Sequence, residues 1–207
     1  MINLKYKGIY KNENQLLNGV LNKDAIMFEE PNNITGLFLR GFLLTSPFFA
    51  LLIIMSYIKI QSANLFSYYF IKENFSTIII ISSLISVLTL FIHEILHALA
   101  FPFKSVKELW IKPNEMAAFI YCNAPVKKSK FIWICLCPNV ILGAFPYMLW
   151  LIGVFDFNET LSLYILILSF LNLLSGIGDY YNVYLTIKQV PNNSYIQNYG
   201  FHSYWFR

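Results

Sequence analysis

The chain has 207 residues, of which 57% are hydrophobic and only 13% are charged. Soluble domains carry about 25% charged residues, so this chain has too little charge to cover the surface of a water-soluble globule. It is also too apolar to be disordered. Because the net charge of +4 is small and scattered, we expect no nucleic-acid partner. The composition indicates a small integral membrane protein surrounded by the lipid bilayer.

Four long apolar runs follow a more polar N-terminal segment. A helix needs about 20 mostly apolar residues to span a bilayer. The runs predict transmembrane helices at 38–58, 75–101, 131–155 and 160–187. Four such runs in so short a chain argue against the alternative, a buried soluble core. We therefore expect an all-α membrane protein, a bundle of about four transmembrane helices.

The basic residues give the orientation. Lysines gather in the N-terminal segment and between the second and third predicted helices, whereas only acidic charges lie between the third and fourth. The positive-inside rule then places both termini and the long central loop in the cytoplasm. We expect a multi-pass protein of the cell membrane, with a cytoplasmic N-terminal segment (1–36), a transmembrane domain (37–190) and a cytoplasmic tail (191–207).

The central loop carries a weak strand signal. Residues 106–111 and 118–122 alternate between apolar and polar side chains, and Pro113-Asn114 lies between them. Alternation on both sides of a turn predicts a small cytoplasmic β-hairpin. The stretch 25–28 is compatible with a further short strand.

The chemistry is concentrated in one pentapeptide, His93-Glu94-Ile95-Leu96-His97, which matches the H-E-x-x-H pattern. Helical residues four apart share a face, so both imidazoles can reach one metal ion, and Glu94 can act beside it as general base. Ionised residues inside an apolar helix are costly and usually functional. The pattern predicts a Zn²⁺ site held by His93 and His97. The alternative is that these side chains pair with other helices for stability alone.

A catalytic zinc usually has three protein ligands, so a third must come from elsewhere in the chain. Counted from the outer ends of their predicted helices at about 1.5 Å per residue, Asp179 and His93 lie at the same depth. Gly176 and Gly178 remove side-chain bulk there and favour close helix approach. Asp179 is therefore the predicted third ligand, with a helix-end carboxylate as the alternative reading. His202, in the C-terminal tail, is the rival ligand.

Further polar residues are expected at a similar depth. Asn139 follows Pro138, which should loosen the third helix and free backbone groups. Its amide is a candidate for binding a substrate carbonyl, and a locally satisfied amide at a kink is the alternative. Asn172 and Ser175 share a face with Asp179. They either orient that carboxylate or make ordinary interhelical hydrogen bonds.

Three features together resemble the intramembrane zinc metalloproteases of the site-two-protease type. They are the long apolar helix that ends in the H-E-x-x-H pattern, Pro138-Asn139 on the next helix, and Gly178-Asp179 on a later helix. The small bacterial membrane proteins classed as putative zincin peptidases look closer still. The resemblance covers about residues 75–190 and implies a transmembrane metallopeptidase-like domain.

The resemblance also implies roles for single residues. His93, His97 and Asp179 match the metal ligands of these proteases, and Glu94 matches their catalytic base. There is one departure from the pattern. The proteases typically carry Asn-Pro-x-Asp-Gly or Leu-Asp-Gly, whereas here the aspartate follows a glycine and precedes Tyr180.

Two functions are compatible with these observations. The first is a membrane-embedded zinc metalloprotease that hydrolyses peptide bonds of transmembrane or membrane-associated proteins, with Glu94 as general base. The second is a non-catalytic multi-pass protein whose structural metal site helps it to bind a partner protein or peptide. The presence of Glu94 favours the enzyme, because a structural site needs the histidines but not the carboxylate between them.

Overall fold

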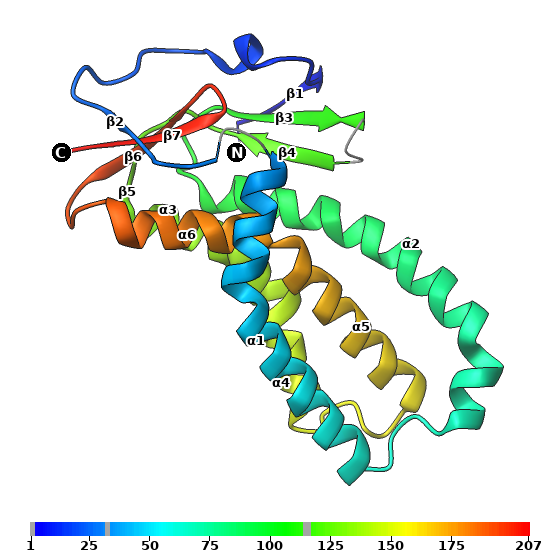
Figure 1. The fold of residues 1–207 in the computed structure, drawn as a ribbon. Coiled ribbons are helices and arrows are strands. Elements are labelled where there is room, and N and C mark those ends of the chain that lie inside the picture. The colour runs from blue at the N-terminus through cyan, green and yellow to red at the C-terminus, as the bar shows by residue number, and fades with distance from the viewer. Residues whose placement is uncertain (1–2, 32–33, 114–116) are drawn as a thin grey trace.

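The computed structural model describes residues 3–31, 34–113 and 117–207. Long helices form one part of the molecule, and two small sheets cover one end of them (Figure 1). Both chain ends lie beside the sheets, whereas two short interhelical connections lie at the opposite end of the helices. We call the two sheets and their connections the cap.

Six α-helices and one π-helical segment build the helical part of the described chain. Their bounds are α1 (Ile34–Ser62), α2 (Tyr68–Ala100), α3 (Lys128–Asn139), η3 (Val140–Ala144), α4 (Phe145–Leu151), α5 (Glu159–Ser175) and α6 (Ile177–Gln189). Two of the helices begin after a polar cap residue that accepts a hydrogen bond from a free backbone N–H, Ser67 before α2 and Asn158 before α5.

Three helical segments are long and apolar enough to cross a membrane: 35–62, 68–100 and 128–151. Helices α5 and α6 together make a fourth span only if they count as one, because they meet at an angle of 48°. Of the four predicted transmembrane helices, three thus have the length and apolar character that a span requires. The fourth predicted helix, 160–187, is the bent pair, which breaks at Gly176.

The third predicted helix is irregular in its middle. Helix α3 ends at Asn139, directly after Pro138, and the chain continues through the π-helical segment η3 into α4. Proline lacks the N–H that a regular helix needs. The expected loosening at Pro138 is therefore confirmed, and it takes the form of a wider helical turn.

Seven strands form the two sheets of the described chain. The first sheet has the order β1-β3-β4, with β1 (Leu4–Ile9), β3 (Lys107–Lys112) and β4 (Ala117–Tyr121). The second has the order β2-β7-β6-β5, with β2 (Ile26–Met27), β7 (His202–Phe206), β6 (Tyr195–Tyr199) and β5 (Val126–Lys127).

The cap corrects the all-α expectation. The predicted hairpin is present as the antiparallel pair β3 and β4, and strand β2 lies inside the stretch 25–28. Asn114 of the predicted turn lies outside the described residues. The other strands were not expected. Strand β1 pairs with β3 and strand β5 pairs with β6, in each case a segment far away in the sequence, so local alternation could not reveal these pairs. Strands β6 and β7 form a local hairpin that was not predicted.

An apolar core joins the cap to the helices. It contains Phe28 near β2, Phe131 of α3 and Ile196 of β6, each at most 5% exposed. Ala100 and Phe101, at the end of α2, belong to the same core. This packing holds the last two turns of α2, which carry the H-E-x-x-H pattern, against the sheets.

Candidate metal centre

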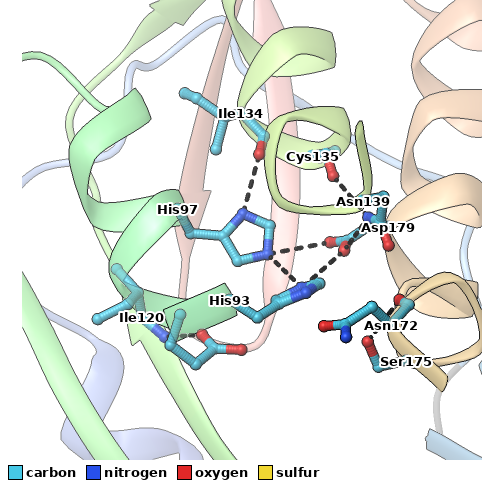
Figure 2. A network of polar contacts seen from close by, with 10 residues as sticks. His93, His97, Ile120, Ile134, Cys135, Asn139, Asn172, Ser175 and Asp179 are labelled. Atoms are coloured by element: carbon cyan, nitrogen blue, oxygen red, sulfur yellow. Dashed lines mark hydrogen bonds and ion pairs between the residues drawn. The ribbon is translucent and has the colours of Figure 1, made fainter. Parts of the chain in front are cut away.

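The last two turns of α2 bring the two predicted histidine ligands together. The Nε2 atoms of His93 and His97 lie 3.1 Å apart, and the two rings meet edge to face (Figure 2). Ligand atoms of His93, Glu94 and His97 all lie within 4.8 Å of one another. The helical spacing of the pattern therefore produces the predicted cluster.

Asp179 completes this cluster from another helix. Its carboxylate lies 3.3 Å from Nε2 of His93 and 3.5 Å from Nε2 of His97. The break at Gly176 starts a new helix, and Asp179 lies in the first turn of α6, pointing toward the end of α2 (Figure 2). The sequence-predicted pair of Asp179 and His93 is thus in contact, although their helices are far apart in the chain.

The geometry of these three side chains fits a zinc ion. In a tetrahedral zinc site with bonds of about 2.0–2.1 Å, neighbouring ligand atoms lie about 3.3–3.4 Å apart. The two Nε2 atoms lie 3.1 Å apart, Oδ2 of Asp179 lies 3.3 Å from Nε2 of His93, and Oδ1 of Asp179 lies 3.5 Å from Nε2 of His97. One proton could satisfy only one pair of these atoms, whereas a divalent cation satisfies all three. His93, His97 and Asp179 could therefore hold the metal.

Hydrogen bonds behind the cluster orient the ligands. Nδ1 of His97 lies 2.9 Å from the carbonyl oxygen of Ile134 in α3 (Figure 2). Because a carbonyl only accepts, Nδ1 must carry the proton, and Nε2 is left with the lone pair that a metal requires. Nδ1 of His93 is buried and has no partner among the described residues.

Asn139 supports Asp179 from the kinked third helix. Its Nδ2 donates to the Asp179 carboxylate at 3.0 Å and to the Cys135 carbonyl at 3.1 Å. The side chain is almost fully buried. Gly176 makes this contact possible, because a Cβ at that position would meet the Asn139 amide at 1.8–2.5 Å. At Gly178 a Cβ would make only an ordinary contact with Leu37.

Glu94 lies on the side of the cluster that faces the cap. Its Oε2 accepts a hydrogen bond of 3.0 Å from the backbone N–H of Ile120 in β4. Within the described chain, β4 pairs with β3 along one edge only. One oxygen of the carboxylate is thus fixed by the strand, and the side chain stays next to the two imidazoles, as a general base requires.

A cavity of about 290 Å³ lies between the cluster and the cap. Glu94, His97 and Asp179 line it from the helices, and Ile120 lines it from β4. The turn between β6 and β7 closes another side of it with His202. The predicted ligands and base therefore face one shared space.

A comparison with known families supports this arrangement. A family model described as "Putative zincin peptidase" (DUF3267) matches residues 86–195, just over half of the chain. The chain belongs to this family. The matched segment runs from α2 to the start of β6 and contains all four residues of the cluster. Membership indicates a zinc metallopeptidase. No curated protein and no solved structure matches the chain.

Other predicted polar residues of this zincin peptidase lie elsewhere. Asn172 donates to Leu168 at 2.8 Å and to Thr89 of α2 at 3.4 Å, and Ser175 donates to the Asn172 carbonyl. Only the hydrogen bond to Thr89 joins two helices, and the other two are within α5. The amide of Asn139 contacts Asp179 rather than the cavity, and its predicted role in substrate binding stays a prediction.

His202 lines the cavity of the zincin peptidase but is bound to another group. Its Nδ1 lies 2.8 Å from Oε1 of Glu30. Burial raises the pKa of the Glu30 carboxyl above its ordinary value, and the hydrogen bond from His202 opposes that rise. Sequence reasoning missed Glu30, Ile120 and Ile134, because Ile120 and Ile134 act through backbone atoms and Glu30 lies 172 positions from His202.

Proposed function

We propose that this zincin peptidase is a membrane-embedded protease of the site-two-protease type, which hydrolyses peptide bonds of transmembrane or membrane-associated proteins. The observation that carries the proposal is the convergence of His93, His97 and Asp179 at separations that suit zinc, beside Glu94. The first three would hold the ion. When bound, zinc supplies a Lewis acid for the scissile carbonyl and lowers the pKa of a water molecule.

Other steps of the reaction are assigned to residues of the chain. Glu94 accepts the proton of the attacking water and returns it to the leaving amine. The N–H of Ile120 binds one oxygen of Glu94 and so orients the other toward the cavity. Asn139 and the Ile134 carbonyl keep the ligands in place.

The strand beside the cavity favours an extended substrate. The backbone carbonyls of an α-helix accept hydrogen bonds within the helix, so a substrate helix must unwind locally to expose a carbonyl to Glu94. The edge of β4 that is free of strands in the described chain offers N–H and C=O groups for pairing with such an extended segment.

We propose that the metal centre faces the cytoplasmic side of the membrane. The cap contains the lysine-rich central loop and lies beside both chain ends. Reporter fusions after Asn64 and Phe157, in the connections at the opposite end, should then report an exported location. A fusion after Lys127 that reports export would contradict this orientation.

The function is tested with the wild type and its Glu94→Gln variant, each loaded with zinc in lipid nanodiscs. A panel of single-span proteins with helix-breaking residues in the span serves as substrate, and fragments are identified by mass spectrometry. We expect cleavage by the wild type and a loss of about 10²–10⁴-fold in Glu94→Gln, with equal zinc content. Equal fragment profiles, also in membranes of cells that express either form, would contradict proteolysis and favour the partner-binding alternative.

A further inference from the structure

The turn between β6 and β7 is fixed at the cavity from both sides of His202. The Phe201 N–H donates to Glu13 at 3.0 Å, and the Ser203 N–H donates to Glu30 at 3.3 Å. The Phe28 N–H donates to the Ser203 carbonyl at 2.9 Å. The N-terminal segment thus holds a tight hairpin turn, and His202 is a positioned side chain rather than part of a loose tail.

The two ring nitrogens of His202 have different surroundings. Nδ1 donates a hydrogen bond to Oε1 of Glu30, and the Ser203 N–H donates to the same oxygen. The Glu30 side chain is only 7% exposed. Nε2 has no hydrogen-bond partner among residues 3–31, 34–113 and 117–207. The side chain of His202 is 23% exposed and lines the same cavity as Glu94, His97 and Asp179.

We propose that His202, held by Glu30, donates a hydrogen bond from Nε2 to the scissile carbonyl oxygen as that oxygen gains negative charge. As an imidazolium the ring donates from both nitrogens, and the Glu30 carboxylate balances its charge. Preorganised donors of this kind stabilise developing oxyanions. No bond forms to His202, and its proton stays on the ring.

This inference rests on the proposed peptidase function, but neither the family match nor the H-E-x-x-H pattern contains it. The matched segment ends at residue 195, before His202. The inference gives His202 a role other than that of the rival metal ligand, since Asp179 contacts both other ligands and Nδ1 of His202 contacts Glu30.

The test uses a phosphinic dialanine pseudopeptide, whose tetrahedral anion imitates a peptide bond under attack by water. Its affinity is measured by calorimetry for the zinc-loaded wild type and for His202→Phe, which keeps a ring but has no donor. We expect the affinity to fall about 10–100-fold, as for loss of a hydrogen bond to a charged group. Zinc content should stay the same. Glu30→Gln should show a smaller loss.

Ser203→Ala is the matched control. Ser203 is the neighbour of His202 and also lines the cavity, but its hydroxyl donates to Asn198 at 3.1 Å. Its loss should leave the affinity for the pseudopeptide unchanged.

A second measurement needs no variant to fold. The chain has only three histidines, so the signals of ¹⁵N-labelled imidazoles are few, and that of His202 should shift when the pseudopeptide binds to the wild type. An unshifted His202 signal, or equal affinity in His202→Phe, would overturn the inference and leave the peptidase proposal intact. Loss of zinc from His202→Phe would make His202 a ligand and overturn the inference too. A wild type that binds no zinc or no pseudopeptide would contradict both proposals.

Discussion

The two ends of the helical part hold their charged groups in different ways. At the end away from the cap, Lys59 of α1 forms an ion pair of 2.8 Å with Asp156, and its Nζ lies 5.2 Å from the centre of the Trp150 ring. One cation there meets one anion. At the capped end, two imidazoles and two carboxylates crowd together, and no lysine or arginine pairs with them among the described residues. The first group is complete as a structural contact, whereas the second has the donor set of a metal site.

The largest effect should come from the ligands at the capped end. Each of the variants His93→Ala, His97→Ala and Asp179→Ala removes one of the three proposed ligands. Loss of a hydrogen bond that supports a ligand lowers metal affinity by about 10–100-fold, and loss of a ligand itself should lower zinc affinity by more than that. Zinc titration against a fluorescent chelator measures the change. Glu94→Gln is the control and should keep wild-type affinity. Normal zinc binding by Asp179→Ala would transfer the third-ligand role elsewhere.

Gly176 should matter more than Gly178. An added Cβ at Gly176 would displace the Asn139 amide and loosen its hydrogen bond to Asp179, whereas at Gly178 it meets Leu37 at 3.5 Å. We expect Gly176→Ala to weaken zinc binding about 10–100-fold and Gly178→Ala to leave it near the wild-type value. The same titration compares the two variants. Equal affinities would show that the contact between Asn139 and Gly176 does not position the ligand.

A double variant sharpens this prediction. If Gly176→Ala acts through the Asn139 side chain, then Asn139→Ala removes the clash together with the hydrogen bond. The double variant Gly176→Ala/Asn139→Ala should therefore bind zinc with the affinity of Asn139→Ala, because the effects of substitutions at contacting residues are not additive. Additive losses of affinity would indicate that Gly176→Ala disturbs α6 by another route.

The smallest effect is expected at the far end. Lys59→Met breaks an ion pair in which the Lys59 side chain is buried and that of Asp156 is partly exposed, and this should lower the free energy of unfolding by about 1–3 kcal/mol. Zinc affinity should not change. Thermal unfolding in detergent and zinc titration give the two values. A clear loss of zinc binding in Lys59→Met would show that the two ends of the helical part are coupled, which would contradict their separate roles.

The predictable part of the structure is the part that local sequence determines. Apolar runs located three spans because hydrophobic length is a local property, and the spacing of His93 and His97 placed both rings on one face of α2. Depth counting paired His93 with Asp179, although the count for Asp179 crosses the break between α5 and α6.

Contacts between distant segments could not be predicted from the sequence. The partnership of Glu30 with His202 and the pairing of β1 with β3 join segments that the sequence separates widely. The separate role of Gly176 depends on where the Asn139 amide lies, since the two glycines look equivalent in a helical pattern. The break before Asp179 was likewise hidden inside an apolar run.

The central claim is that His93, His97 and Asp179 together hold one zinc ion. X-ray absorption at the zinc edge, on the wild type loaded with one equivalent of zinc, tests it most directly. The account predicts two imidazole nitrogens and oxygen ligands at about 2.0–2.1 Å, with one imidazole lost in His97→Ala. Three imidazoles, which would include His202, or a sulfur ligand at about 2.3 Å would contradict it.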